Sequence, residues 1–295
     1  MNKKIVTLVT SLALGGTLLV TTAFASANEV SGYEAYKSAV LNMQNVKSLT
    51  FKADVSVKDN GNNLISADSQ AKVNLDNKTM SSTVDLKNAS TEKSVSVFKE
   101  ADKTITKTSD SNVYNVMQQN KSNDKGDFNK KDEKISPERL QSLTNIVDAL
   151  VGNVKSYFTL NNNADGSKTV TVKLSESQVL PVANAVASAV MKDKGTFELK
   201  GNKLGSNINV DVPKLENDIR VTSLDVTANI NKDNIIDSQV INVALVGKDA
   251  SGTEHNLTAA VNMNISNMNS TTPDSVNLAG KQTKTVTEQD FRHRN

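Results

Sequence analysis

The sequence contains no cysteine and no tryptophan, and aromatic residues make up 4% of its 295 residues. The absence of cysteine excludes a disulfide scaffold, a zinc–thiolate centre and a cysteine nucleophile. Histidine occurs only at His255 and His293, so nitrogen ligands for a transition metal are scarce. We therefore expect neither a metal site nor a cofactor.

An excess of charge of one sign is missing as well. The chain has 34 Lys and Arg residues against 32 Asp and Glu residues, and arginine occurs only four times. A nucleic-acid-binding domain usually presents a basic face, so we expect no nucleic-acid partner. Only residues 5–20 form an apolar run that approaches the length of a membrane span. The sequence thus excludes a membrane protein with several spans.

The first 27 residues have the pattern of an export signal. Two lysines precede the apolar run over residues 5–20, and the small residues Ala25 and Ala27 follow it. This pattern predicts cleavage after Ala27, which makes Asn28 the mature N-terminus, with cleavage after Ala25 as the alternative. An uncleaved anchor is less consistent with the polar residues inside the run. The signal predicts a secreted or extracytoplasmic protein of a bacterial cell envelope, with no transmembrane helix after cleavage.

The mature chain opens with a helix and then changes to strand periodicity. Ser31 and Glu34 form a capping box, and apolar residues at helical spacing predict a helix over residues 31–46. Alternation with a period of two follows at residues 49–57 and ends at the turn residues 59–62. The later segments with the same alternation are residues 65–75, 80–86, 95–97, 103–108, 112–117, 156–160, 169–173, 208–212, 224–230, 241–245 and 257–265.

Two further helices are predicted in the middle of the chain. Residues 140–154 carry a regular apolar stripe behind a Ser-Pro start, and we place Leu143, Ile146 and Val147 of this stripe against the sheet. Residues 179–191 are apolar on nearly every side, so this helix, with Val186 on one stripe, belongs beneath the sheet. The polar segment 118–134 is predicted to be a mobile loop.

These elements predict an α+β fold in which a large curved antiparallel β-sheet, a half-barrel, wraps around two to three helices. Residues 28–266 form one domain in this interpretation, and residues 267–295 form a polar C-terminal tail.

Two short motifs suggest chemistry but lack the partners that the chemistry needs. Residues 161–166 imitate the front half of a calcium loop, but position twelve is Val172 rather than a bidentate acid, which favours an ordinary turn. Glu254 and His255 form an acid–base pair in sequence. Because no nucleophile elbow or oxyanion loop accompanies this pair, we interpret His255 as surface decoration and expect no catalytic residue.

The order of elements resembles the lipoprotein-carrier fold of the LolA and LppX superfamily. The resemblance rests on the helix at 33–43 that runs into the strand at 49–57, on the hairpins up to residue 86 and on the helix at 140–154. It implies that the space between sheet and helices holds an acyl chain or another apolar ligand. The chain departs from the periplasmic carriers in its lack of tryptophan and its few arginines, and it lacks the cysteine of the lipid-anchored members.

We therefore expect a non-enzymatic envelope protein that binds a lipid, another hydrophobic small molecule or an envelope protein partner in the concave face of the sheet. The alternative is a structural or surface-interaction domain with a filled core and no ligand. The predicted ligand contacts are Phe51, Val55, Leu143, Ile146, Val147, Val186, Val261 and Met263.

Overall fold

The computed structural model describes residues 31–118, 152–179, 181, 184, 187–188, 197–201, 206–210 and 212–287. The predicted export signal, residues 119–134 of the predicted loop and residues 140–151 of the second predicted helix lie outside the described residues. So do Leu143, Ile146, Val147 and Val186.

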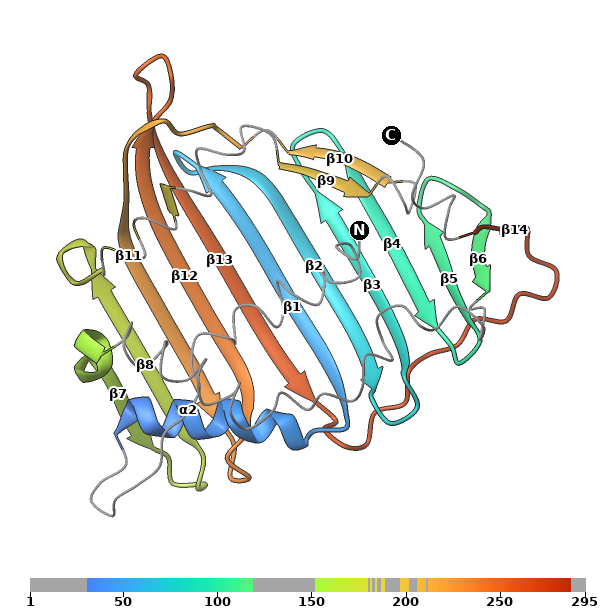
Figure 1. The fold of residues 1–295 in the computed structure, drawn as a ribbon, viewed down its shortest axis with the longest axis horizontal. Coiled ribbons are helices and arrows are strands. Elements are labelled where there is room, and N and C mark those ends of the chain that lie inside the picture. The colour runs from blue at the N-terminus through green and yellow to red at the C-terminus, as the bar shows by residue number, and fades with distance from the viewer. Residues whose placement is uncertain are drawn as a thin grey trace.

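A single open sheet of twelve strands dominates the described part of the chain (Figure 1). Its order is β14-β6-β5-β4-β3-β2-β1-β13-β12-β11-β8-β7, and all neighbours are antiparallel except β14 and β6. The strands of the first half are β1 (Ser48–Asp59), β2 (Asn62–Asn74), β3 (Thr79–Lys87), β4 (Glu92–Lys99), β5 (Lys103–Thr108) and β6 (Tyr114–Gln118). Those of the second half are β7 (Phe158–Asn162), β8 (Lys168–Ser175), β11 (Asn217–Ile230), β12 (Ile236–Lys248), β13 (Glu254–Ser266) and β14 (Thr283–Thr285).

A separate hairpin of β9 (Phe197–Gly201) and β10 (Ser206–Val210) completes the strands. The predicted large antiparallel sheet is therefore confirmed.

Residue alternation gives the sheet two chemically different faces. In β1, Phe51 stands opposite Ala71 of β2 and Ile265 of β13, whereas the intervening Lys52 stands opposite Gln70 and is exposed. We call the side of Phe51 the inner face and the side of Lys52 the outer face. An antiparallel sheet with one apolar and one polar face can cover its core on one side and meet water on the other.

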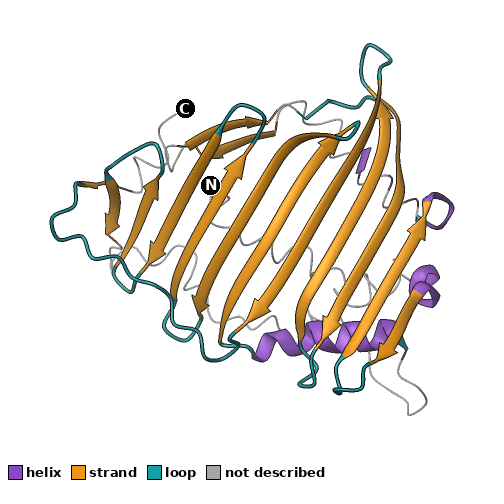
Figure 2. Ribbon diagram, turned by 180° about the vertical axis from the view of Figure 1, so that it is seen from behind, coloured by secondary structure: helices purple, strands orange, loops and turns teal. Residues whose placement is uncertain are grey.

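The helix α2 (Gly32–Asn42) crosses one end of the inner face. It contacts β7, β8, β11 and β12, and it lies in front of the strands in Figure 1 and behind them in Figure 2. Ser31 caps it by accepting a hydrogen bond from the backbone N–H of Glu34 at 3.2 Å. Tyr33 is 1% exposed, and its ring meets Phe158 of β7 edge-on, with centroids 5.3 Å apart. This packing closes the helix end of the inner face.

The expectation of two to three helices is not matched, because the described residues contain α2 as their one complete α-helix. Beside it are the short 3₁₀-helices η1 (Met43–Asn45), η2 (Gly152–Tyr157) and η3 (Glu176–Gln178). Residues 152–154, the last part of the predicted helix at 140–154, instead belong to η2. Within the described ranges, no helix has the length and apolar character needed to cross a bilayer.

The opposite end of the inner face is covered by residues 212–216. Val212 packs against Ile65 of β2, and Leu215 is fully buried. Gly247 of β12 makes room for Leu215, since a Cβ built on this glycine would lie 2.9 Å from Leu215 Cδ1. The two ends of the inner face are thus both covered.

The C-terminal segment after β13 runs along the outer face as a strap, which we define as residues 267–287. The Thr271 hydroxyl lies 2.9 Å from that of Thr50, and the Asp274 carboxylate lies 2.7 Å from Lys72 Nζ. The strap then adds β14 to the free edge of β6 (Figure 1). The segment predicted to be a polar tail therefore carries specific contacts and a short strand.

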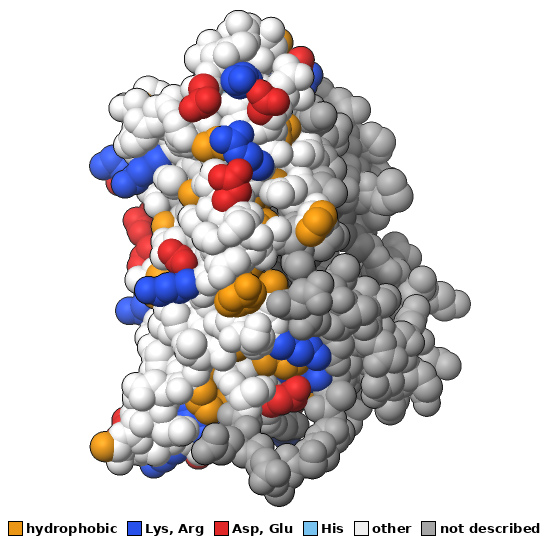
Figure 3. All heavy atoms as spheres, turned by 90° about the vertical axis from the view of Figure 1, so that its left-hand side faces the viewer, with side chains coloured by type: hydrophobic (Ala, Val, Ile, Leu, Met, Phe, Trp, Pro, Cys, Tyr) orange, Lys and Arg blue, Asp and Glu red, His pale blue; other side chains and the backbone are white. Residues whose placement is uncertain are grey.

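The surface near β7 and β8 is mixed in charge. Seen from that side, acidic and basic side chains are interspersed, and apolar side chains form small separate patches (Figure 3). This part of the surface shows no large field of one sign of the kind that would attract a polyanion.

Candidate ligand-binding face

A band of half-buried apolar side chains remains between the two covered ends of the inner face. Register aligns Val55 of β1 with Val261 of β13, and Val261 in turn with Ile241 of β12. Strand pairing thus brings residues that are far apart in sequence into one continuous apolar surface. We call this surface the central band and define it by its eight half-buried members: Val55, Val57, Leu224, Val226, Ile241, Val243, Ala259 and Val261.

The predicted contact residues divide into two groups within the described structure. Val55 and Val261 are direct partners in the central band. Phe51 and Met263 are 7% and 2% exposed, and both belong to one closed apolar cluster at the same end of the sheet as α2. Their burial makes them core residues rather than surface that a ligand reaches first.

Sequence reasoning missed the contribution of β11 and β12 to this surface. Their alternation is visible in the sequence, and so is the hairpin between β12 and β13, but nothing in the sequence shows that β13 lies directly beside β1. Strand order places Ile241 beside Val261 and Val226 beside Ile241.

A buried polar pair marks the α2 end of the central band. Gln239 of β12 faces inward and donates a hydrogen bond from Nε2 to the hydroxyl oxygen of Tyr36 at 2.9 Å. Burial raises the pKa of Tyr36, although the hydrogen bond from Gln239 opposes the shift, so the phenol stays protonated at neutral pH. Gln239 Oε1 is buried and has no hydrogen-bond partner among the described residues.

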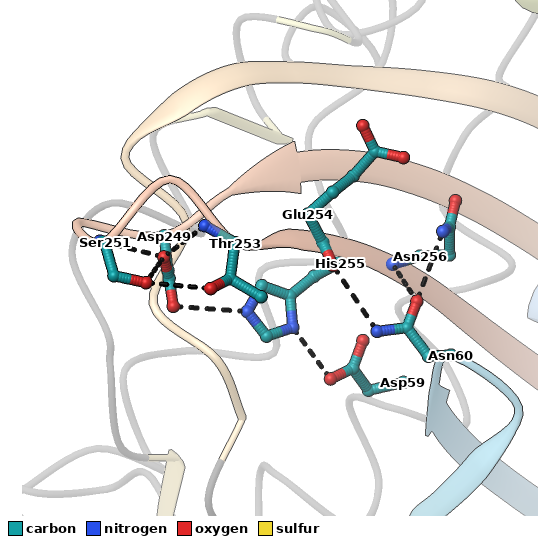
Figure 4. Close-up of polar contacts among 8 residues, drawn as sticks. All are labelled: Asp59, Asn60, Asp249, Ser251, Thr253, Glu254, His255 and Asn256. Carbon is teal, nitrogen blue, oxygen red and sulfur yellow. Dashed lines mark hydrogen bonds and ion pairs between the residues drawn. The ribbon is translucent and has the colours of Figure 1, made fainter.

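A histidine held by two carboxylates marks the other end. His255 Nδ1 lies 2.8 Å from Asp59 Oδ2, and His255 Nε2 lies 3.5 Å from Asp249 Oδ2 (Figure 4). The His255 side chain is 14% exposed, so its interpretation as surface decoration is wrong. The reason is the pairing of β1 with β13, which places the end of one strand beside the start of the other.

The protonation of this histidine follows from its neighbours. Burial disfavours the imidazolium, but the hydrogen bonds and negative charges of Asp59 and Asp249 outweigh it and raise the pKa of His255. The pKa of Asp249 is lowered to about 2, first by the Ser251 hydroxyl and then by the Thr253 N–H and His255.

Both ring nitrogens of His255 are therefore engaged, which leaves no lone pair for a metal or a substrate proton. The arrangement links two turns.

Acidic side chains also meet on the outer face. Asp54, Asp68 and Asp85 stand in register across β1, β2 and β3, and partial burial together with the neighbouring carboxylates raises the pKa of Asp68. Within the part of the chain that the structure describes, no three His, Cys, Asp or Glu side chains are arranged so that they could hold a metal ion. In the calcium-like loop, Asp165 accepts hydrogen bonds from the N–H and hydroxyl of Ser167, which is the geometry of a turn.

A shallow hollow of about 260 Å³ lies on the outer face over β1, β11, β12 and β13. The small side chains of Ala244 and Ala260 lie among polar neighbours such as Asn242 and Thr258. The hollow is partly open, and its lining combines polar and apolar side chains.

Comparison with known proteins assigns no family. No family model matches the chain, and no curated protein matches it. Among solved structures, the chain is similar to a β-barrel-like protein of the domain of unknown function DUF1849 from Brucella abortus. The two share 10% identity over 75% of this chain and 99% of that chain, with a TM-score of 0.17. So low a TM-score carries no argument, and the fold rests on the strand pairing itself.

Proposed function

We propose that this protein is an exported, non-enzymatic component of the bacterial cell envelope that binds an apolar ligand, such as an acyl chain, along the central band. One observation carries the proposal. Both ends of the inner face are covered by the chain itself, and the eight residues of the central band between them remain half-buried. The β11 side of the band packs in part against the chain, because Leu224, Val226 and Val243 contact the cluster that contains Val154 and Val179. Covering such a surface with an apolar molecule removes more of it from water, which is favourable in proportion to the area.

The sequence supports the cellular setting of this proposal. The N-terminal pattern that ends at Ala27 fits an exported protein, and the resemblance to the LolA and LppX carriers fits a half-barrel that curls around its helices and holds a lipid. The register of the inner face agrees with such a role, because apolar side chains from four adjacent strands line up in two continuous rows.

Filling the central band tests the proposal directly. Ala259 lies in the band and Ala260, the next residue, faces outward, and both are half-buried. Native mass spectrometry of the purified protein should show a copurified lipid, and a fluorescent fatty acid should bind. Ala259→Phe should weaken that binding at least tenfold, whereas Ala260→Phe should leave it unchanged.

Circular dichroism of both variants checks that the fold is intact. A wild-type protein that carries no lipid and takes up no fatty acid would contradict the proposal and leave the structural alternative, a domain with a filled core.

A further inference from the structure

The inner face contains one polar pair that its surroundings do not explain. Gln239 is 2% exposed and Tyr36 is 5% exposed. The neighbours of Gln239 in the same row of the sheet are Met263, 2% exposed, and Ala228, fully buried. An apolar side chain at position 239 would continue this row without cost, whereas a buried amide loses its bonds to water and must find replacements.

The pair has hydrogen-bonding capacity beyond its own bond. With Gln239 Nε2 as the donor to Tyr36, the Tyr36 O–H remains to donate elsewhere, and Gln239 Oε1 has no partner among the described residues. In the opposite amide orientation, the Tyr36 O–H donates to the carbonyl oxygen, and the amide N–H groups need an acceptor instead. Either way the pair offers both a donor and an acceptor to a third group.

The pair also lies where a ligand on the central band would end. Ile241, a member of the band, follows Gln239 on the same face of β12, and the apolar positions continue along the strand to Leu245. At about 3.3 Å per residue, the distance from Gln239 to Leu245 is about 20 Å. An extended apolar chain on the band therefore reaches the polar pair with one end.

We propose that Tyr36 and Gln239 form a head-group subsite for an amphipathic ligand whose neutral head both donates and accepts a hydrogen bond, such as a long-chain alcohol or a protonated long-chain acid. This inference rests on the proposed binding of an apolar chain to the central band. A neutral head fits because the row around Gln239 is uncharged and buried, and an ion there would lose its hydration without a counter-charge.

A competition experiment on the full chain tests the subsite. The apolar dye Nile red is bound first and then displaced by a long-chain primary alcohol or by its methyl ether, which accepts a hydrogen bond but cannot donate one. The alcohol should displace the dye at a concentration at least tenfold lower than the ether. Gln239→Met should abolish this preference while it retains dye binding, and Gln70→Met, the same change at an exposed outer-face position, should preserve the preference.

Tyr36→Phe provides a second variant that keeps the aromatic ring, and it should also reduce the preference. Equal displacement by alcohol and ether in the wild type would overturn the subsite while the central band kept its proposed role. A preference that survives Gln239→Met and Tyr36→Phe would show that other groups of the protein cause it, and this too would overturn the inference. A wild-type protein that binds neither dye nor ligand would remove both the subsite and the proposed function.

Discussion

The imidazole of His255 and the carboxylate of Asp59, 196 residues apart in sequence, meet at 2.8 Å where β1 ends beside β13. Asp249 approaches the other ring nitrogen from the hairpin between β12 and β13. One side chain thereby connects the turns at the ends of both hairpins, and its charge state affects how firmly they are held.

This connection predicts a stability that depends on pH. The pKa of His255 is raised in the folded protein, so its stabilising contribution is fully present below its unfolded pKa of about 6.5 and is lost as the pH rises through the folded value. His255→Gln should therefore lower the free energy of unfolding by about 1–2 kcal/mol at pH 6, with a smaller loss at pH 9. Urea denaturation at both pH values measures the difference, and Asn264→Gln on the exposed outer face serves as the control. An equal loss at the two pH values would show that the imidazolium charge plays no part.

A new negative charge should cost far more stability at Met263 than at the adjacent residue of β13, Asn264. Met263 is 2% exposed on the inner face, so Met263→Asp buries a carboxylate without a partner. This change should lower the free energy of unfolding by roughly 3 kcal/mol or more. Asn264 is exposed on the outer face, and Asn264→Asp should cost under about 0.5 kcal/mol. Thermal denaturation of the two variants compares the faces directly, and similar losses would mean that the assignment of faces is wrong.

Substitution by alanine should change stability by different amounts at Gly32 and Gly247, because different atoms surround these two glycines. A Cβ at Gly32 would lie 2.8 Å from the backbone oxygen of Phe158, which cannot move without shifting β7, whereas at Gly247 the nearest atom is the flexible Leu215 side chain. We expect Gly32→Ala to destabilise by about 1–3 kcal/mol and Gly247→Ala to cost less. Chemical denaturation is the measurement. A stabilised Gly32→Ala variant, as in an exposed helix, would show that α2 is not held tightly against β7.

The attachment of the strap to the sheet should depend more on its buried hydroxyl contact than on its exposed ion pair. Thr271 is 6% exposed and its hydroxyl bonds that of Thr50, so Thr271→Val leaves a buried hydroxyl without this partner and should cost about 1–2 kcal/mol. Asp274 is largely exposed, and Asp274→Asn should cost under about 1 kcal/mol despite its 2.7 Å contact with Lys72. Hydrogen exchange of the β6 amides reports whether β14 stays attached in each variant. A larger effect from Asp274→Asn would reverse this ranking.

Much of the sheet could be predicted because its strands alternate in polarity. The alternation at residues 49–57 and 257–265 predicts β1 and β13 within a few residues of their observed bounds. The start of β12 was not predicted, because Gln239 places a polar side chain on the inner face and breaks the pattern there. β14 has only three residues, too few for any period to appear.

The site was less predictable because it depends on pairing over long distances. Val55 and Val261 were both expected to contact a ligand, but their direct alignment depends on the register of β1 with β13, which no local pattern encodes. The same holds for Asp59 and His255, whose contact exists only once these strands are paired.

The position of β1 beside β13 also determines which strand pairs form early and which form late during folding. The hairpins of each half of the sheet join strands that are close in sequence, so they can form early. The pairing in the middle of the sheet joins Thr50 to Ser266 and must wait until nearly the whole chain is free to move. Contacts of such long range slow folding, since the entropy of closing the loop is lost before the contacts stabilise it. In the export that we propose, a chain threaded from its N-terminus would therefore complete the centre of its sheet only after residue 266 had crossed, with both apolar halves exposed until then.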